Sequence, residues 1–360
     1  MKKVGILTSG GDCQGLNASI RGVAKALYEY YGDGVEIYGI RDGYRGLIQG
    51  DYEKMKRSDF SGILTLGGTI LGTSRQPFKL MRVIDEESNV DKVKNMKQNY
   101  KKMDLDCLVI LGGNGTHKTA NLLSEEGLNV VTLPKTIDND VWGTDMTFGF
   151  QSAVDIAANT IDCIHTTATS HGRIFIVEVM GHKVGWLTLH AGIAGGADVI
   201  LLPEIPYDID SIAKTIRQRN KQRKNFSILA VAEGAISKKE AKMSKKEFKA
   251  ARAAMTYPSI SYRIAHELEE KLEDQEVRVV VPGHVQRGGS PCPYDRVLST
   301  RFGAAAAKLI IKKQYGNMVA LQNGRIVPVP LSEVAGKLKV VPPDCDVIQT
   351  ARDIGITFGD

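Results

Sequence analysis

The chain has 360 residues, of which 42% are hydrophobic and 24% charged, a composition typical of an ordinary globular protein. Its net charge of +6 is spread over interspersed basic and acidic residues, which argues against a protein built for bulk nucleic-acid binding. No stretch approaches the roughly 20 apolar residues that cross a bilayer, so we expect neither a nucleic-acid nor a membrane partner.

The N-terminus, MKKVGILTSGGD, runs directly into a predicted strand and lacks the apolar region and cleavage site of a signal peptide. The five cysteines are an odd number, are widely spaced and contain no C-x-x-C pair, so free thiols are the expected state. These features favour a cytoplasmic location.

Short β-branched runs recur along the chain and predict strands that are covered on both faces. They occupy residues 4–8, 35–40, 107–112, 130–133, 174–179, 199–202, 227–232 and 277–281. Helical periods lie between several of them, at residues 15–30, 116–126, 150–164 and 259–273. This alternation predicts mostly parallel sheets with right-handed crossovers. Because the strands are more than one sheet usually holds, we expect an α/β fold with two doubly wound domains.

The segment 237–252, SKKEAKMSKKEFKAAR, is dense in lysine and has few large apolar residues. We interpret it as a solvated helix or mobile excursion, in preference to a nucleic-acid patch.

Two predicted strands end in glycine turns that lead into helices. Gly10-Gly11-Asp12 follows residues 4–8, and Gly113-Asn114-Gly115-Thr116 follows residues 107–112. Ligands of parallel sheets bind beyond the carboxyl ends of the strands, where glycine lets backbone N–H groups approach an anion. Glycine after a strand is more often only a tight turn, so either motif alone is weak evidence for a phosphate site.

A third loop, LPKTIDNDVWGTD at residues 133–145, crowds three aspartates and a lysine behind another predicted strand. Asp138 and Asp140 can project to different points of one crevice, although paired aspartates in a loop can equally serve to cap a turn. The chain has neither a P-loop nor a dinucleotide fingerprint. Two glycine turns and two carboxylates suit phosphoryl transfer, with one aspartate as the base and the other helping to hold a metal.

Six motifs in this order resemble the 6-phosphofructokinases. They are ILTSGGD (6–12), GGTILGTSR (67–75), GGNGT (112–116), PKTIDND (134–140), EVMG (178–181) and PGHVQRGGSPCPYDR (282–296). The resemblance covers residue 4 to about 305 and fades beyond roughly residue 315. It implies a glycolytic kinase that transfers a terminal phosphoryl group to the 1-hydroxyl of fructose 6-phosphate, giving fructose 1,6-bisphosphate.

On the donor side, the resemblance implies that Asp138 is the general base, with Arg75 and Thr136 as further catalytic residues. By the same resemblance, Arg75 is expected to neutralise the transferring group and Thr136 to position the sugar. Asp140 and Asn114 are implied to organise Mg²⁺. The implied donor-binding residues are Gly11, Arg75, Gly113, Asn114, Gly115, Thr116 and Lys135.

On the acceptor side, the resemblance implies a larger set that binds the sugar phosphate. It comprises Thr136, Asp138, Asp140, Arg173, Met180, Gly181, His182, Glu233, Arg278, His284 and Arg287. The family counterparts of Arg173 and Arg278 complete a neighbouring subunit's pocket. The implied assembly is therefore a homotetramer, or else a homodimer, with sites shared between subunits.

The implied architecture is two α/β domains of phosphofructokinase type. The donor domain spans residues 1–149 plus 287–336, and the sugar-phosphate domain spans 150–286 plus 337–360. Two departures keep a second class of function open, a non-catalytic paralogue that senses sugar phosphates. Asn114 stands where ATP-using bacterial members usually have aspartate, and His182 stands in place of arginine.

The two candidate phosphoryl donors are ATP and pyrophosphate. Gly115 resembles ATP users, since pyrophosphate users place an aspartate there that would collide with the α-phosphate of a nucleotide. Lys135 resembles pyrophosphate users. Because a fixed carboxylate excludes the nucleotide whereas a lysine can swing aside or assist, we expect ATP with Mg²⁺.

Overall fold

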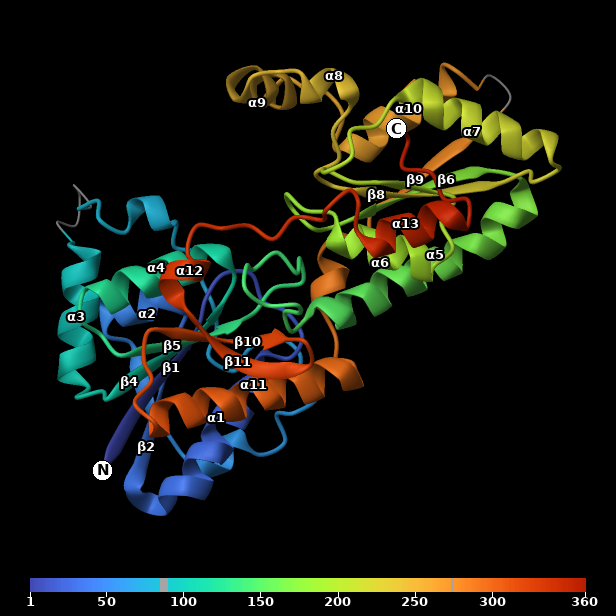
Figure 1. Cartoon of the computed structure of the whole chain (residues 1–360). Helices are drawn as coiled ribbons and strands as arrows, with labels where there is room; N and C mark the ends of the chain where they lie inside the picture. The colour runs from blue at the N-terminus through green and yellow to red at the C-terminus, as the bar shows by residue number, and fades with distance from the viewer. Residues whose placement is uncertain (85–89, 273–274) are drawn as a thin grey trace. The chain divides into compact units, whose positions relative to one another are not determined.

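The computed structural model describes residues 1–84, 90–272 and 275–360. The chain divides into two compact units. Unit 1 comprises Met1–Ser152 with Arg287–Lys339, and unit 2 comprises Ala153–Gln286 with Val340–Asp360. Each unit holds one sheet with helices on both faces, which gives the expected α/β fold with two mostly parallel sheets (Figure 1).

The sheet of unit 1 has the strand order β11-β10-β5-β4-β1-β2-β3. Its strands are β1 (Lys2–Thr8), β2 (Val35–Ile40), β3 (Tyr52–Met55), β4 (Cys107–Gly112), β5 (Val130–Pro134), β10 (Asn317–Gln322) and β11 (Arg325–Pro330). The inner strands run parallel, and the two edge strands β3 and β11 are antiparallel to their neighbours.

Helices cover both faces of this sheet, with α1 and α11 packed together on one face and α2, α3 and α4 on the other (Figure 1). The helices are α1 (Leu16–Tyr31), α2 (Tyr44–Gln49), α3 (Lys92–Lys102), α4 (Asn114–Glu125), α11 (Pro293–Ile311) and α12 (Leu331–Val334). Every residue of β4 is buried, as a continuous apolar run covered on both sides requires.

The sheet of unit 2 is wholly parallel, in the order β7-β8-β6-β9. Its strands are β6 (Ile174–Val179), β7 (Val199–Leu201), β8 (Ser227–Ala232) and β9 (Val277–Val280). Its helices are α6 (Trp186–Ala194), α7 (Ile209–Lys221), α8 (Lys238–Ala241), α9 (Lys245–Ala253), α10 (Ile260–Glu269) and α13 (Asp346–Asp353). Helix α5 (Phe150–His171) begins in unit 1 and continues through unit 2.

All eight strands predicted from apolar runs are present, within a few residues of their expected ends. The predicted helices correspond to α1, α4, α5 and α10; α5 is longer than expected, and residue 273, the expected end of the last one, lies outside the described residues. The lysine-rich segment forms α8 and α9, each opened by a capping box, and α9 has no buried residue. Sequence reasoning missed the edge strands β3 and β11 and the inner strand β10.

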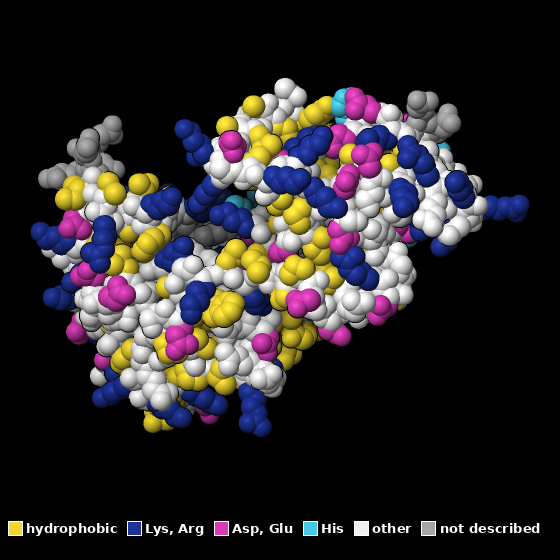
Figure 2. Space-filling model, turned by 45° about the horizontal axis from the view of Figure 1, so that its top comes forward, with side chains coloured by type: hydrophobic (Ala, Val, Ile, Leu, Met, Phe, Trp, Pro, Cys, Tyr) yellow, Lys and Arg dark blue, Asp and Glu magenta, His cyan; other side chains and the backbone are white. Residues whose placement is uncertain are grey.

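Figure 2 shows Lys and Arg side chains mixed with Asp and Glu over the visible surface. Within the described parts of the chain, no helix is both long enough and apolar enough to span a membrane.

Candidate active site

Three candidate loops of unit 1 meet at one edge of its sheet. Strands β1, β4 and β5 are parallel neighbours, so their carboxyl ends lie side by side. The Gly10-Gly11 turn leaves β1, the glycine turn at residues 113–116 leaves β4, and the aspartate loop at residues 135–145 leaves β5. The sheet topology therefore brings together residues that the sequence separates by more than a hundred positions.

Two cations fix the first glycine turn. The Lys135 ammonium donates a hydrogen bond to the carbonyl of Gly11, and the Arg287 guanidinium donates to the carbonyl of Asp12 at 3.0 Å. A Cβ on Gly11 would lie 3.0 Å from the Arg287 guanidinium, so a larger residue there would displace the guanidinium slightly. Burial lowers the pKa of Lys135. Arg287, expected on the acceptor side, thus lies beside the candidate donor turn.

Arg75 is placed next to the same turn by its two predecessors. The Gly10 N–H donates to the Ser74 carbonyl at 3.1 Å, and the Thr73 hydroxyl donates to the Gly10 carbonyl at 2.7 Å. Arg75 itself is exposed. Among the described residues it forms no ion pair, so its charge is available for an anion.

The second turn is the N-terminus of the twelve-residue helix α4, with Gly113 as its N-cap. A Cβ added to Gly115 would meet nothing within 4 Å, so the helix presents open space there. The buried Tyr44 hydroxyl holds the turn from behind by donating to the Thr116 carbonyl at 2.8 Å. Backbone N–H groups and the helix dipole at this end favour a phosphate.

The aspartate loop turns sharply between its two carboxylates because Asn139 has φ 51, in the left-handed region that asparagine tolerates. The Thr136 hydroxyl accepts from the Asp138 N–H at 3.1 Å and fixes the start of the turn. Asp138 Oδ1 is buried and has no hydrogen-bond partner among the described residues. An acceptor left in this state suits a base that receives a proton from a substrate.

Asp140 and Asn114 form the candidate metal pair. The Asn114 amide donates to Asp140 Oδ2 at 2.7 Å and to the Asp140 carbonyl at 3.1 Å. Burial, assisted by the neighbouring charge of Asp138, raises the pKa of Asp140 to about 6. Asn114 Oδ1 is buried without a hydrogen-bond partner among the described residues, so an amide oxygen remains as a ligand.

This oxygen set fits Mg²⁺, which takes one or two carboxylates and completes its shell with water and substrate phosphates. Within residues 1–84, 90–272 and 275–360, no group of three or more His, Cys, Asp or Glu side chains could hold a metal alone. A metal at Asp140 would therefore complete its shell with water or with oxygen atoms of a bound phosphate.

In unit 2, four of the expected acceptor residues gather at the carboxyl ends of β6 and β8. The Glu233 carboxylate accepts from the N–H groups of Gly181, at 3.3 Å, and His182, at 2.7 Å. Gly181 has φ 146, and a Cβ there would lie 2.6 Å from the Val184 carbonyl, so the turn needs glycine. Met180 precedes this turn, and its N–H donates to the Gln286 side chain at 3.2 Å.

His284 lies in the short 3₁₀ turn Gly283–Arg287 after β9, and its side chain is exposed. Because β9 is parallel to β6, this turn leaves the same edge of the sheet as Met180. The Gln286 amide donates to the Gly283 carbonyl at 3.0 Å and so ties the turn to the Met180 backbone.

Arg173 and Arg278 lie near the amino ends of β6 and β9, at the opposite ends of these strands from Met180 and His284. Arg173 precedes β6, and Arg278 is opposite Phe175 in the β6–β9 register. Both guanidiniums pair with the Glu276 carboxylate. Since strands rise roughly 3.3 Å per residue, Phe175 and Met180 are separated by roughly 16 Å along the chain. One chain therefore does not bring the two arginines to the Glu233 turn.

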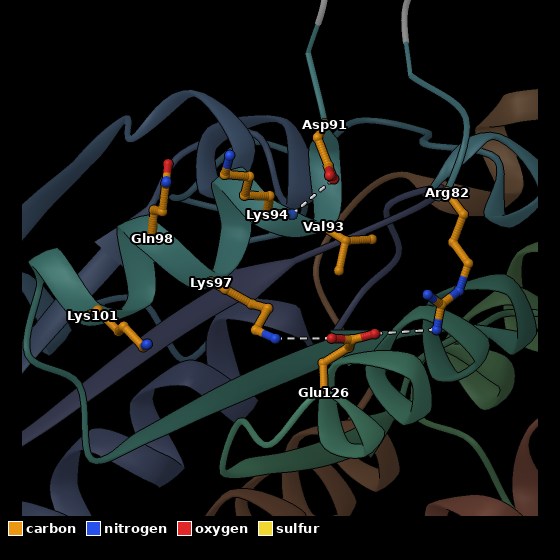
Figure 3. Close-up of a pocket in the computed structure, with 8 residues that line it drawn as sticks. All are labelled: Arg82, Asp91, Val93, Lys94, Lys97, Gln98, Lys101 and Glu126. Carbon is orange, nitrogen blue, oxygen red and sulfur yellow. Dashed lines mark hydrogen bonds and ion pairs between the residues drawn. The ribbon is translucent and has the colours of Figure 1, made fainter.

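Among the cavities of the structure, one borders expected acceptor residues and another lies away from the expected site. One of about 610 Å³ in unit 2 is lined by Glu233, His182 and Lys183 and walled by Met243, Lys245 and Phe248 of the α8–α9 segment. The other, about 460 Å³ in unit 1, lies along α3 and contains none of the expected site residues. Figure 3 shows that Arg82 and Lys97 flank Glu126 in this cavity. Both cations pair with the Glu126 carboxylate, so their charges are balanced within the cavity wall.

The sequence analysis did not select four residues that support the site: Tyr44, Asn139, Gln286 and Lys339. Asn139 carried a signal, because an asparagine between two aspartates in a loop often adopts the left-handed conformation. Gln286 lies within the quoted motif at residues 282–296, but its contact with Met180 is remote in sequence. Tyr44 and Lys339 also act through remote contacts, and no local pattern marks them.

The fold and the site together define a phosphate-handling α/β enzyme, and comparisons with known proteins agree. A model of the Phosphofructokinase family matches residues 3–310. The ATP-dependent 6-phosphofructokinase of Spirochaeta thermophila is 58% identical over 99% of this chain and 97% of its own. The ATP-dependent 6-phosphofructokinase 3 of Bacteroides thetaiotaomicron is 49% identical over 99% of this chain and 100% of its own.

The crystal structure of Pichia pastoris phosphofructokinase in the T-state superposes with a TM-score of 0.79 at 32% identity. The match covers 92% of this chain and 35% of the longer yeast chain, so this protein spans about a third of that chain's length. The chain belongs to the phosphofructokinase family.

Proposed function

We propose that the protein is an ATP-dependent 6-phosphofructokinase of glycolysis. It transfers the γ-phosphoryl group of ATP to the 1-hydroxyl of fructose 6-phosphate and releases ADP and fructose 1,6-bisphosphate. The observation that carries the proposal is the full-length identity of 58% to a relative of that name. The geometry agrees, because an unpartnered aspartate oxygen stands beside two phosphate-type turns at one sheet edge.

In this reaction Asp138 accepts the proton of the 1-hydroxyl as its oxygen attacks the γ-phosphorus. The bond between that oxygen and phosphorus forms while the bond from phosphorus to the β,γ-bridging oxygen breaks, and ADP leaves. Arg75 faces the charge that spreads over the transferring group, and Thr136 fixes the turn that carries the base. The turns at Gly11 and at Gly113 to Thr116 hold the donor phosphates.

Asp140 and Asn114 would hold Mg²⁺, which neutralises phosphate charge when bound. Unit 1 is thus the proposed donor domain. Unit 2 is the proposed acceptor domain, in which Glu233 and the turn of Met180, Gly181 and His182 hold the sugar.

ATP is the proposed donor for two reasons. The space at Gly115 is open, and the names of the relatives agree. Lys135, the residue that resembles pyrophosphate users, directs its ammonium to the Gly11 carbonyl, where it fixes the turn. Its presence is therefore accounted for without a pyrophosphate ligand.

The proposed assembly is a homotetramer, or else a homodimer, whose subunits share sites. It is supported by the position of Arg173 and Arg278 near the amino ends of the unit-2 strands, whereas Glu233 lies at the carboxyl ends. The proposed location is the cytoplasm. It is supported by Cys13, Cys107, Cys163 and Cys345, which are free thiols, as a reducing compartment maintains them.

The test is formation of fructose 1,6-bisphosphate by the purified protein with Mg²⁺ and fructose 6-phosphate, with ATP or pyrophosphate as donor. We expect ATP to give the higher kcat/KM. A protein that binds fructose 6-phosphate yet forms no bisphosphate with either donor would instead be the non-catalytic paralogue that Asn114 and His182 left open.

A further inference from the structure

A short segment near the C-terminus lies against the aspartate loop. Leu338 forms an antiparallel bridge with Val141, and the Lys339 N–H donates to the Asp140 carbonyl at 2.9 Å. The segment and the loop both belong to unit 1, although about 200 residues separate them in sequence. Backbone pairing on this side therefore fixes the position of Asp140.

The side chain of Lys339 continues the contact. Its ammonium lies 2.9 Å from each of three oxygen atoms, Asn139 Oδ1 and the carbonyls of Thr144 and Asp145. A lysine ammonium has three protons to donate, so all three can be used at once. Both ends of the turn at residues 139–145 are thereby held by one charged group.

Asn139 transmits this hold to the two aspartates. Its side chain is 3% exposed, and its Oδ1 also accepts from the Thr147 N–H at 3.0 Å. Because its φ of 51 makes the turn that separates Asp138 from Asp140, any rotation at Asn139 changes the relative position of the two carboxylates. Asparagine tolerates this conformation, and the contacts of its side chain select it here.

We propose that Lys339 is a positioning residue for phosphoryl transfer, which holds Asn139 and thereby sets the relative position of Asp138 and Asp140. The inference rests on the proposed function for the roles of the two aspartates. Lys339 lies beyond residues 3–310, which the family model matches, so that match gives no role to it. It touches neither reacting group and acts through the loop.

The kinetic test replaces Lys339 by methionine, which keeps an unbranched side chain as far as the ε position and removes the ammonium. We expect kcat to fall by a factor on the order of 10 to 10², because small misplacements of catalytic groups cost that much. KM for ATP and for fructose 6-phosphate should change by less than about threefold, since the binding turns stay in place. Lys339→Arg should recover part of the loss, and the exposed Lys312→Met should leave kcat unchanged.

A spectroscopic test reads the loop directly. Trp142 lies within the loop and is 45% exposed, and the only other tryptophan is Trp186. In a Trp186→Phe background, we expect Lys339→Met to shift the emission of Trp142 and raise its quenching by acrylamide. Lys312→Met should do neither. If Lys339→Met removed the ammonium contacts without loosening the loop, its Trp142 emission would match that of the Trp186→Phe parent.

Unchanged kcat and unchanged Trp142 emission would overturn the inference. So would a loss of activity explained wholly by a lower folded fraction, with no rescue by arginine. If the unmodified protein forms no fructose 1,6-bisphosphate, the proposed function fails, and the Trp142 emission alone then decides whether Lys339 holds the loop.

Discussion

At the scale of single residues, the site keeps polar atoms in a costly state. Asp138 Oδ1 and Asn114 Oδ1 are both buried without hydrogen-bond partners among the described residues. A buried acceptor left unpaired costs roughly 1–3 kcal/mol, which an ordinary loop would avoid by turning toward water. Both oxygens have proposed roles: that of Asp138 accepts a proton, and that of Asn114 binds a metal. A bound substrate or metal would supply the partners that these two oxygens lack within the protein.

Asp138→Asn should lower kcat by a factor on the order of 10² or more, the usual size of a lost general base. KM for fructose 6-phosphate should change much less, because the amide keeps the shape of the side chain. Steady-state kinetics of the pure variant measure both quantities. Asp145→Asn, in the same loop but exposed, is the matched control and should keep normal kcat. A near-normal rate for Asp138→Asn would remove this residue from the role of base.

Gly115→Asp should cripple the use of ATP. The new side chain fits the protein itself, because nothing lies within 4 Å of a Cβ there, and an acidic residue in the first turn suits helix α4. Its carboxylate would face the α-phosphate, and like charges this close repel by a few kcal/mol at intermediate dielectric. We expect a higher KM for ATP and kcat/KM lower by a factor on the order of 10².

Gly115→Ala is the control, since its methyl group adds bulk without charge. Kinetics with ATP and with pyrophosphate on the unmodified protein, Gly115→Asp and Gly115→Ala separate the effect of charge from the effect of bulk. A clear preference of the unmodified protein for pyrophosphate would contradict the assignment of the donor.

At the scale of elements, the apolar runs located the parallel strands because burial on both faces leaves an unbroken hydrophobic signature. Edge strands lack that signature, and the four residues of β3, YEKM, show no run at all. The hairpin of β10 and β11 did carry a signal that was overlooked. Asn323 and Gly324 both have positive φ, as an Asn-Gly hairpin turn requires.

The site divides in the same way. Its glycine turns and aspartate loop were predictable, because strand ends and family motifs mark them locally. Two contacts were not predictable: the hydrogen bond from Arg287 to the Asp12 carbonyl and the hydrogen bond from Lys339 to Asn139. Both depend on how segments distant in sequence pack. The pairing of Arg173 and Arg278 through Glu276 likewise appears only when β6 and β9 are aligned.

The α8–α9 segment depends on one buried carboxylate. Glu240 is 5% exposed, pairs with Arg252 and Arg263, and also closes a capping box with Ser237. Although burial alone would raise it, hydrogen bonds and the charge of the two arginines lower the pKa of Glu240 to about 2. Glu240→Gln removes the charge and takes from Arg252 its ion-pair partner among the described residues, while Arg263 keeps only Glu267. We therefore expect a destabilisation of about 2 kcal/mol at pH 7.

The pH dependence follows from the lowered pKa of Glu240. Its contribution to stability is fully present above the unfolded pKa near 4.5 and is lost as the pH falls toward 2. The thermal unfolding midpoints of the unmodified protein and of Glu240→Gln should therefore differ less at pH 3 than at pH 7. Glu247→Gln, in the exposed capping box of α9, should change the midpoint little. A difference that widens in acid would refute the role of the Glu240 charge.

At the scale of the whole molecule, the proposed acceptor residues do not all gather at one place within one chain. Glu233 lies at the carboxyl edge of the unit-2 sheet, and Arg278 lies near the amino edge, held by Glu276. Helix α11 also exposes Tyr294 and Val297, three residues apart, by 48% and 60%. Paired apolar residues on one helix face are a common feature of surfaces that associate.

Mixing two inactive variants tests whether subunits share sites. Asp138→Asn removes the proposed base, and Arg278→Ala removes the cation proposed to serve a neighbour. In a mixed dimer one site carries both defects and the other carries neither. After subunits exchange at equal concentrations, half of the dimers are mixed and each has one intact site, so activity should return to about a quarter of normal.

The matched control mixes Asp138→Asn with Gly115→Asp. Both positions lie in unit 1 and would serve the same site, so every site in a mixed dimer keeps one defect. That mixture should stay inactive, whereas the first mixture recovers. Equal failure of both mixtures after proven subunit exchange would show that Arg278 acts within its own chain or not at all. Full specific activity from a protein shown by light scattering to be monomeric would contradict shared sites altogether.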